Sequence, residues 1–331
     1  MSRLPPGTNR RRLSQNDTGD RNVRIIILYA GLETREQNWP DHCSLALQRV
    51  AGSNVLGHIL NQLREVRAGK ITLVVERDLD AIAAWAAQDM PDLVIDFIKT
   101  APGTAPLEAL AACRGCFEQE PLLLNLGSHI VEAEFKDLHE TIAGVTLFVK
   151  PAEDEALHDP AQDSFSWAGV CYFRHGDVLG AALDRALPVD RANLADCLTD
   201  LYNSDLSVDL RPATLSLDTG TIEGLLFANA RLLGLGYGSE DAVERSYVED
   251  FTVIPPVFLH ETAEIENSVV GPFTNVEAGA RINGSVVRNS LLGRDSAVQN
   301  AVLDGSIIGP RARVEVAGAA LIVEEGTIVN E

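Results

Sequence analysis

Residues 23–35 read VRIIILYAGLETR, and this stretch sets the interpretation of the N-terminal part of the chain. Val23–Leu28 is a continuous apolar run of the kind that forms a buried parallel strand. The loop that follows has the character of a phosphate-cradling loop, which needs glycine because the backbone must approach phosphate oxygens closely. Glu33 occupies one of the glycine positions. Two like charges about 4 Å apart repel by roughly 1 kcal/mol in water and roughly 4 kcal/mol near a protein surface. The loop therefore predicts nucleotide chemistry that has been lost or altered.

Strand and helix signals alternate from residue 23 to about residue 234. Strands are predicted at residues 23–29, 70–76, 93–98, 121–126, 145–150, 168–173 and 208–217. Helices are predicted at residues 54–67, 78–89, 106–117, 177–186, 193–202 and 221–233. Continuous β-branched runs separated by amphipathic helices indicate a mostly parallel sheet covered on both faces. The predicted fold class of this part is α/β, with a Rossmann-like arrangement.

The C-terminal part of the chain is repetitive. Val270, Val276 and Ile282 are spaced by six residues, and steps of sixteen residues reach further apolar positions: Val286, Leu292, Val298, Val302, Ile308 and Val314. Such hexapeptide-type repeats predict a left-handed parallel β-helix whose triangular coils point one aliphatic residue of each side inward. β-Helices of this kind often serve acyltransferases, which need a catalytic base, but residues 261–331 contain no histidine. We therefore predict a structural or oligomerising module.

Composition divides the chain into four predicted segments: a disordered basic tail at 1–22, an α/β domain at 23–234, a linker at 235–254 and the β-helix at 255–331. The tail has no apolar core, so it is not expected to be a secretory signal. The alternative to a disordered tail is an arm that docks to an acidic partner. No apolar run approaches the ~20 residues of a membrane span. The net charge of −21 disfavours nucleic acid and anionic membranes as partners, so neither is expected.

The spacing of the five cysteines does not match that of a disulfide framework. Cys113 and Cys116 form a lone C-x-x-C in an alanine-rich helical stretch, with no second pair to complete a zinc site. We predict core or helix-surface thiols, which fit a reducing, cytoplasmic location.

An α/β domain that begins with a strand and a Gly-rich loop, and that is followed by a hexad β-helix, resembles the sugar-1-phosphate nucleotidyltransferases. The resemblance covers residues 23–331. The family includes the glucose-1-phosphate thymidylyltransferase-like enzymes and their mannose-1-phosphate and ADP-glucose relatives. Such enzymes join a nucleoside triphosphate to a sugar phosphate, use magnesium and release pyrophosphate. Their catalysis depends on positioning and on neutralising charge.

Several family motifs are retained. The resemblance implies that Arg35 is catalytic and that Gly169, in Trp167–Phe173, contacts substrate. It implies that Asp218, in the run Leu217-Asp218-Thr219-Gly220-Thr221, is a metal ligand. The residues that it implies for nucleotide binding are Ala30, Gly31, Thr34, Gly103, Thr104 and Ala105.

Other family motifs are lost. Leu45 stands where the family has a phosphate-binding lysine, and Ser128 replaces the aspartate that is the first metal ligand. The family's Glu-Lys-Pro segment has no counterpart near residues 150–165. Removing one preorganised electrostatic group commonly costs about 10²- to 10³-fold in rate, so several losses together imply little turnover.

Three functions follow from this pattern. The first is a catalytically impaired or inactive nucleotidyltransferase-like protein that binds a nucleotide or nucleotide sugar and acts in a regulatory or partner-subunit role. The second is an active Mg²⁺-dependent enzyme that makes an NDP-sugar, and only this function requires Mg²⁺. The third is an assembly scaffold without nucleotide binding. In each case the open coil ends of the β-helix predict a homo- or hetero-oligomer.

An active enzyme would need substitutes for the lost groups. Candidate substitutes for the positive charge are Arg49, Lys99 and Lys150, and candidate metal ligands are Glu33, Asp218 and Glu223.

Some of these residues have structural alternatives. Asp218 could instead cap the helix that begins near Thr221, and Arg35 could be a surface ion-pair residue. Gly103 and Thr104 could form an ordinary helix start. His129, next to Ser128, is either a substitute metal ligand or a solvated loop histidine.

Overall fold

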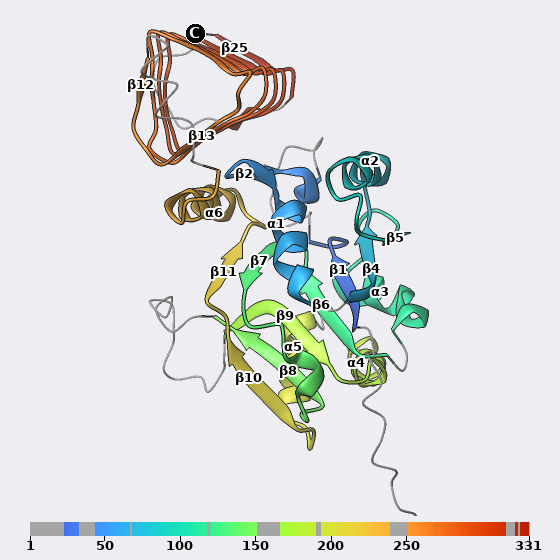
Figure 1. The fold of residues 1–331 in the computed structure, drawn as a ribbon. Helices are drawn as coiled ribbons and strands as arrows, with labels where there is room; N and C mark the ends of the chain where they lie inside the picture. Colours follow the sequence, from blue (N-terminus) through green and yellow to red (C-terminus); the bar gives the residue numbers. More distant parts are fainter. Residues whose placement is uncertain are drawn as a thin grey trace, which may run out of the picture.

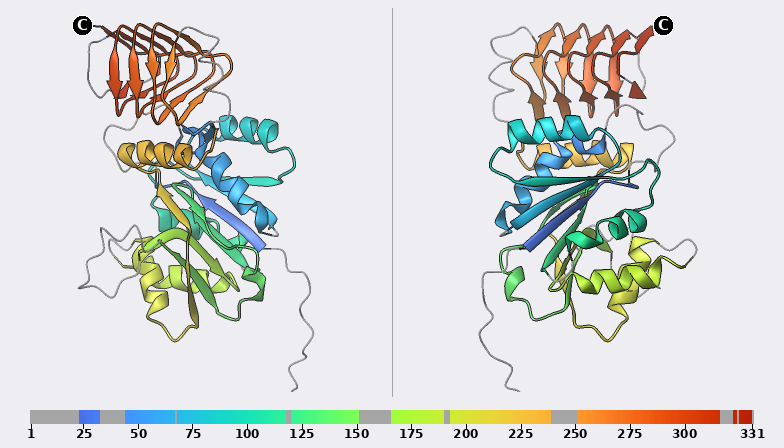
Figure 2. Two further views of the ribbon diagram at one scale, coloured as in Figure 1. Left: turned by 60° about the vertical axis from the view of Figure 1, so that its left-hand side comes forward. Right: turned by 90° about the vertical axis from the view of Figure 1, so that its right-hand side faces the viewer.

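The structure is a computed structural model that describes residues 23–32, 44–66, 68–117, 120–150, 166–189, 193–238, 251–315, 322–323 and 325–330. An α/β domain is followed by a triangular β-helix that packs against one side of it (Figures 1 and 2). The predicted basic tail, residues 1–22, lies outside the described residues. No described helix is both long and apolar enough to cross a membrane.

A seven-stranded sheet forms the middle of the α/β domain, in the order β10-β8-β9-β6-β1-β4-β5. Its strands are β1 (Val23–Leu28), β4 (Ala68–Val75), β5 (Ile95–Lys99), β6 (Leu122–Leu126), β8 (Val145–Val149), β9 (Trp167–Phe173) and β10 (Val208–Pro212). Only β9 runs antiparallel to its neighbours, β6 and β8, so the predicted mostly parallel sheet is confirmed.

Strand β1 is buried on both faces of this sheet. Ile25 and Ile27 belong to one apolar cluster, and Ile26 and Leu28 belong to another. Because successive side chains of a strand point to opposite faces, a strand covered on both faces is apolar at successive positions. This explains the unbroken apolar run from Ile25 to Leu28, whereas Arg24 near the start of the strand pairs with Glu120.

The described α-helices cover both faces of the sheet. They are α1 (Val55–Gln62), α2 (Leu79–Asp89), α3 (Pro106–Ala112), α4 (Asp177–Ala186), α5 (Leu194–Tyr202) and α6 (Ile222–Gly234). Side chains of α1, α2 and α6 pack with Ile25 on one face, and those of α3, α4 and α5 pack with Ile26 on the other. Two predicted helices end early, because their last turns are 3₁₀ segments at Leu63–Glu65 and Arg114–Cys116. Cys113 is buried and free, and burial raises the pKa of its thiol to about 12.

The predicted strand 208–217 is two strands that belong to different sheets. Strand β10 ends at Pro212, which has no N–H to continue a ladder. Strand β11 (Leu215–Asp218) instead pairs antiparallel with β7 (His129–Glu132), a strand that the sequence analysis missed. This small sheet carries site residues, as described below.

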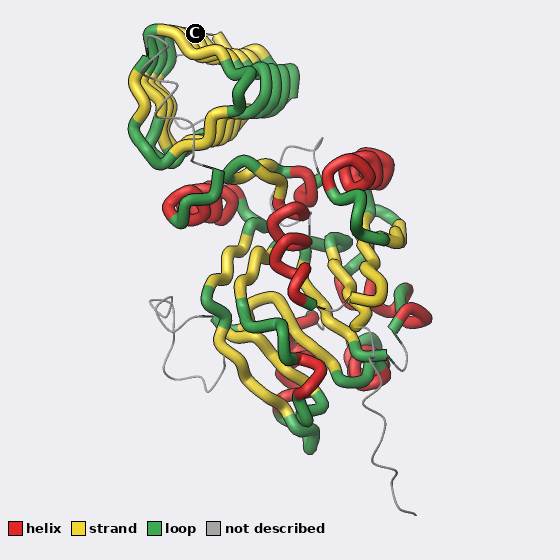
Figure 3. The backbone as a smooth tube through the Cα atoms, in the orientation of Figure 1, coloured by secondary structure: helices red, strands yellow, loops and turns green. Residues whose placement is uncertain are grey.

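The β-helix consists of three parallel sheets, which form the sides of a triangle (Figure 3). The first sheet contains β12 (Thr252–Val253), β15 (Val269–Val270), β18 (Val286–Arg288) and β21 (Val302–Asp304). The second contains β13 (Val257–Leu259), β16 (Thr274–Val276), β19 (Leu291–Leu292), β22 (Ile307–Ile308) and β24 (Ile322–Val323). The third contains β14 (Glu264–Glu266), β17 (Arg281–Asn283), β20 (Ala297–Gln299), β23 (Arg313–Glu315) and β25 (Ile328–Asn330). The first strand, β12, begins before the predicted boundary at residue 255.

Two of the predicted inward positions are wrong. Val286 and Val302 are 39% and 50% exposed, whereas their neighbours Val287 and Leu303 are fully buried. Val270 pairs with Val287, so the coil that joins them has seventeen residues rather than sixteen. A slip of one residue moves a strand side chain to the other face of the sheet, which is why both valines point outward.

The β-helix packs on the α/β domain through the outer face of its second sheet. Leu291 and Ile307 on that face belong to the same apolar cluster as β1 and α1. Beside them lies a polar network that we call the junction clamp, formed by Arg49, Ala51, Gly52, Asn229, Phe273, Asn275 and Glu277. Short strands β2 (Arg49–Val50) and β3 (Ser53–Asn54), with the turn between them, present the first three of these residues.

The side chains of Asn229 and Glu277 make the main contacts of the junction clamp. Asn229 of α6 accepts a hydrogen bond from the Ala51 N–H and donates one to the Phe273 carbonyl, both at 2.9 Å. The buried carboxylate of Glu277 lies 3.0 Å from Arg49 and accepts a hydrogen bond from Asn275. Arg49, considered as a substitute for the lost phosphate lysine, is therefore engaged at the junction.

We expect Asn229→Ala to destabilise the chain by about 2–4 kcal/mol, because it leaves a buried N–H and a carbonyl without partners. Chemical denaturation measures this loss in the free energy of unfolding. Asn61→Ala is the matched control, since Asn61 is an exposed helix amide and its loss should stay within about 0.5 kcal/mol. Equal effects of the two variants would contradict a clamping role for Asn229.

Candidate active site

A cavity of about 680 Å³ opens at the carboxyl ends of strands β1, β5 and β6. Ligands of open α/β sheets bind at this edge. Its described lining comprises Gly31, Leu32, Ala105, Pro106, Leu107, Leu126, His129, Ser166, Trp167, Asn193, Leu194, Ala195, Leu198, Thr199 and Asp218. We call it the sheet-edge cavity.

Two of the predicted nucleotide-binding residues, Gly31 and Ala105, line this cavity together. Gly31 has a φ of 77°, and a Cβ there would lie 2.6 Å from Cδ of Pro106, so only glycine allows this approach. Ala30 is buried directly before Gly31. The predicted residues Thr34 and Arg35, and also Glu33, lie outside the described residues.

The segment of Gly103 and Thr104 has a structural role beside the cavity. The Gly103 N–H donates to the Glu76 carboxylate at 2.9 Å, and the Thr104 hydroxyl donates to the Ala101 carbonyl at 2.6 Å. Ala105 is the N-cap residue of α3. The segment is thus a helix start, and its end reaches the cavity wall through Ala105.

The pairing of β7 with β11 places His129 directly opposite Asp218. Nε2 of His129 lies 3.8 Å from Oδ2 of Asp218, and Nδ1 lies 2.9 Å from the Ser128 hydroxyl. The Ser128 carbonyl accepts hydrogen bonds from the backbone N–H and the hydroxyl of Thr219, at 2.7 and 2.8 Å. Ser128, His129 and Asp218 therefore form one cluster, held by backbone and side-chain bonds.

Two of the structural alternatives are wrong. His129 is not a solvated loop residue, because it lies in a strand and is only 8% exposed. Asp218 does not cap α6, because the N-cap is Thr221, whose hydroxyl accepts from the Gly224 N–H. Asp218 accepts instead from the Gly220 N–H at 2.9 Å through Oδ1. Its other oxygen faces His129.

Gly169, predicted to contact substrate, lies behind the ring of His129. Its φ is 92°, and a Cβ there would lie 2.6 Å from the Cβ of His129. Gly169 does not line the described cavity. It makes room for the histidine instead.

The sequence analysis did not identify one part of the lining. It consists of Trp167 of β9 and of residues at the start of α5, which are Asn193, Leu194, Ala195, Leu198 and Thr199. Asn193 caps α5 and shares a capping box with Asp196, a sequence signal for a helix start that does not reveal a cavity. This part of the lining is mainly apolar, through Leu194 and Leu198.

Among the described lining residues there is no Lys or Arg. Lys99, Lys150 and Glu223, considered as substitute groups, are not part of the lining either. Leu45, at the position of the family's lysine, is 1% exposed and belongs to the apolar core. A lysine at that position would bury a charge rather than reach the cavity.

The magnesium that the resemblance implies does not fit the donor set present. Mg²⁺ prefers oxygen ligands in near-octahedral geometry. Here a hydroxyl replaces one carboxylate, and this Ser128 hydroxyl is already hydrogen-bonded to His129. In the part of the chain that the structure describes, no group of three or more His, Cys, Asp or Glu side chains is placed to hold a metal ion.

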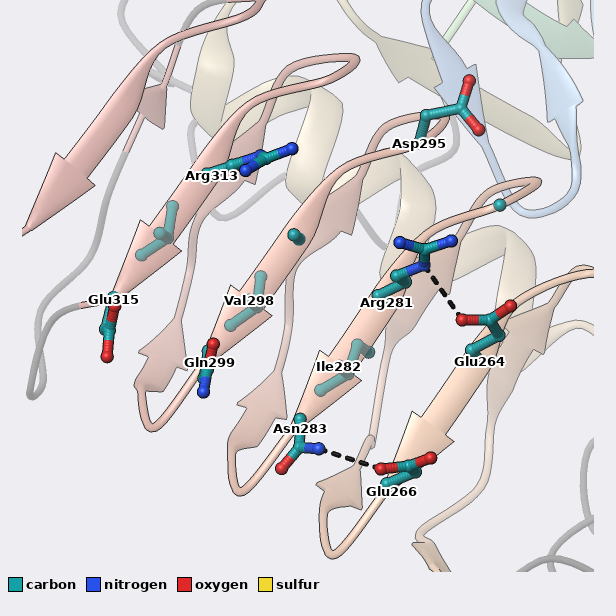
Figure 4. Close-up of a pocket in the computed structure, with 13 residues that line it drawn as sticks. Glu264, Glu266, Arg281, Ile282, Asn283, Asp295, Val298, Gln299, Arg313 and Glu315 are labelled. Atoms are coloured by element: carbon teal, nitrogen blue, oxygen red, sulfur yellow. Dashed lines mark hydrogen bonds and ion pairs between the residues drawn. The ribbon is translucent and has the colours of Figure 1, made fainter.

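A second hollow of about 690 Å³ lies on the outer face of the third β-helix sheet (Figure 4). Its charged and polar side chains pair with one another: Arg281 contacts Glu264, and Asn283 donates to Glu266, both at 2.9 Å. These side chains are exposed, so the hollow is a solvated sheet face. The sheet-edge cavity is the better candidate site.

Comparisons with known proteins support this fold. No protein-family model matches the chain. The bifunctional protein GlmU of Leifsonia xyli subsp. xyli is 30% identical over 108 residues, which are 32% of this chain and 22% of that protein. GlmU of Azorhizobium caulinodans is 31% identical over 101 residues, which are 30% of this chain and 21% of that protein. The match thus spans about a fifth of these curated relatives.

A solved structure shares the α/β fold. The putative glucose-1-phosphate thymidylyltransferase from Bacillus anthracis, in complex with a sucrose, superposes with a TM-score of 0.53 at 14% identity. The superposition covers 63% of this chain and 94% of that one. The chain therefore shares the α/β fold of that protein. The shared fold and the partial GlmU matches support the predicted relationship to the sugar-1-phosphate nucleotidyltransferases.

We expect Gly169→Ala to destabilise the α/β domain by about 2–4 kcal/mol, because the methyl group adds backbone strain and collides with His129. Thermal and chemical denaturation measure the loss. Gly234→Ala is the control, since Gly234 is the last residue of α6 and has open space where a Cβ would lie. This second variant should be neutral or slightly stabilising. A neutral Gly169→Ala would show that His129 is not held against this strand.

Proposed function

We propose that the chain binds a nucleotide or nucleotide sugar in the sheet-edge cavity and has impaired or no nucleotidyltransferase turnover. It would then act in a regulatory or partner-subunit role. The observation that carries the proposal is the cluster at the base of the cavity. There Ser128 replaces a metal carboxylate, and His129 takes up the space between Ser128, Gly169 and Asp218.

Retained ligand binding is supported by the shape of the cavity. Its volume of about 680 Å³ falls in the usual range for small-molecule sites, about 300–1,000 Å³. Gly31 lets the backbone come close to a ligand, and Trp167 adds an aromatic side chain to the lining. Leu194 and Leu198 supply apolar area.

Impaired turnover is supported by the charges. Phosphoryl transfer needs cations that neutralise the phosphates and the developing charge. The described lining offers no Lys or Arg, and Asp218 is its only carboxylate. An active Mg²⁺-dependent enzyme is the alternative, and it would need groups from outside the described lining, such as Arg35.

The test compares binding and catalysis in the same preparations. Calorimetry with five nucleoside triphosphates and common nucleotide sugars should detect binding. The rate of Mg²⁺-dependent pyrophosphate release should not exceed the rate measured without protein. Ser128→Asp should tighten Mg²⁺-dependent triphosphate binding about tenfold, equivalent to about 1.4 kcal/mol, because it supplies a second carboxylate.

Ser207→Asp adds the same charge at an exposed position outside the described lining. This control variant should leave triphosphate binding unchanged. Native turnover in the usual enzymatic range of about 1–10³ s⁻¹ would contradict impairment. Absence of binding by every ligand would leave the assembly scaffold as the remaining function.

We also propose that the β-helix mediates a homo- or hetero-oligomer. Val286 and Val302 pair on adjacent strands β18 and β21, and both point outward from the first sheet. Together they form a small exposed apolar ladder. An exposed sheet face with aliphatic side chains favours contact with a partner.

We expect the double variant Val286→Lys/Val302→Lys to lower the molar mass measured by light scattering, because lysine on both rungs makes burial of this face costly. Val94→Lys, at a position that is 74% exposed in the α/β domain, is the control. An unchanged mass in the double variant would exclude this face as the contact.

A further inference from the structure

We infer that a second cavity, between the α/β domain and the β-helix, binds a small organic cation that carries a primary ammonium group. The cavity has a volume of about 610 Å³, within the range of about 300–1,000 Å³ that is usual for small-molecule sites. We call it the junction cavity. No described residue lines both this cavity and the sheet-edge cavity, so the inference is independent of the proposed function.

The side chains that carry the inference come from both parts of the chain. His58 belongs to α1, Glu132 to β7 and Phe258 to β13 of the β-helix. Tyr237, which follows α6, completes this set. A ligand in the junction cavity would therefore contact the α/β domain and the β-helix together.

The charge of the lining favours a cation. Glu65, Glu132 and Glu134 line the cavity, and no Lys or Arg is found among its described lining residues. Arg49 acts electrostatically on His58, but its guanidinium is paired with Glu277 at 3.0 Å. Carboxylates alone do not select a ligand, because water solvates exposed charges well. The groups beside them narrow the chemistry.

His58 places an acceptor without a partner in the lining. The residue is only 5% exposed. Its Nε2 lies 2.9 Å from the Val50 carbonyl, which can only accept, so the ring proton lies on Nε2. Burial lowers the pKa of His58, so the imidazole is neutral near pH 7 and Nδ1 has a lone pair. No described residue donates a hydrogen bond to this Nδ1, and an N–H group of a ligand would satisfy it.

Glu132 and Tyr237 form a preset pair next to His58. The Tyr237 hydroxyl donates to Oε1 of Glu132 at 2.6 Å. This hydrogen bond raises the pKa of Tyr237 to about 12, so the phenol keeps its proton. The bond engages Oε1 and leaves Oε2 of Glu132 to accept from a ligand. The Tyr237 ring meets the His58 ring edge-to-face, with ring centroids 5.7 Å apart, so the carboxylate, the phenol and the imidazole are neighbours.

A primary ammonium group on a short alkyl chain matches this set of groups. It has three N–H donors, which suit Nδ1 of His58 and the carboxylates. Its positive charge is attracted by aromatic rings, here those of Tyr237 and Phe258, and the alkyl chain buries apolar surface against them. The three carboxylates would repel a phosphate-bearing ligand, and a neutral polyol would leave their charge unmatched.

The experiment titrates the full chain with 1,4-diaminobutane in a calorimeter. The salt concentration is about 0.15 M, where the Debye length is about 8 Å and distant charges are screened. 1,4-Butanediol, which has the same carbon chain without charge, is the ligand control. We expect one site for the diamine and an affinity for the diol that is at least about tenfold lower.

Two single variants test the preset pair. Glu132→Gln should weaken diamine binding at least about tenfold, because it removes the charge that the ammonium group contacts. Tyr237→Phe should bind within about twofold of the native chain, because the aromatic ring remains. A loss in Tyr237→Phe as large as that in Glu132→Gln would contradict the assignment of the carboxylate as the ammonium ligand.

Two double variants separate the cavity from the net charge of the chain. Glu65→Gln/Glu134→Gln removes two exposed carboxylates of the lining and should weaken binding at least about threefold, so the test stays decisive even where Glu132→Gln disturbs folding. Glu140→Gln/Glu315→Gln removes the same charge at exposed positions outside the described lining and should bind the diamine like the native chain.

Equal affinities for the diamine and the diol would overturn the inference. An equal loss in the two double variants would also overturn it, because the cation would then respond to net charge and not to the junction cavity. Diamine binding that is lost in Glu132→Gln, while nucleotide binding in the same preparation is unchanged, would support the inference and show that the two cavities bind separately.

Discussion

The antiparallel pairing of β7 with β11 is the constraint on which the chemistry of the cavity depends. Thr219 donates both its N–H and its hydroxyl to the Ser128 carbonyl, so the two strands meet in one register. In that register His129 faces Asp218. A slip of one strand by one residue would turn its side chain to the opposite face and separate His129 from Asp218. The histidine–aspartate pair of the described lining therefore depends on two short strands.

The main sheet could be predicted because its signals are local and repeated. A strand such as β1, buried on both faces, carries an unbroken apolar run from Ile25 to Leu28, and helices between such strands leave few alternatives to a parallel sheet. Strand β7 was missed because it has only four residues and follows a Gly-Ser pair, so its length carries no periodic signal. Without β7, His129 looked like part of a loop. Its role depends on a partner strand far along the chain, which no local pattern contains.

The β-helix and the candidate site show the same limit of prediction from sequence. The repeat period identified the architecture, yet one extra residue in a coil turned Val286 and Val302 outward. Motif matching identified Asp218 and Gly31 as cavity residues, but it did not show that Gly169 packs against His129 or that Leu45 lies in the apolar core. Both omissions have one cause. A motif position states which residue aligns, whereas burial and packing decide what that residue contacts.

The polar atoms of the cluster argue that the site has been rebuilt rather than simply eroded. A buried donor or acceptor left without a partner costs about 1–3 kcal/mol, so losses that accumulate at random would leave such atoms behind. Here the Ser128 hydroxyl lies against His129, Oδ1 of Asp218 accepts from Gly220, and the Thr219 hydroxyl donates to Ser128. Gly169 is also compatible with the histidine ring in a way that alanine would not be. Apart from the Asn125 amide oxygen, which is buried without a hydrogen-bond partner, the polar atoms around Ser128 are matched by neighbours. The serine is therefore accommodated by His129 and Thr219 rather than left as an unfilled gap.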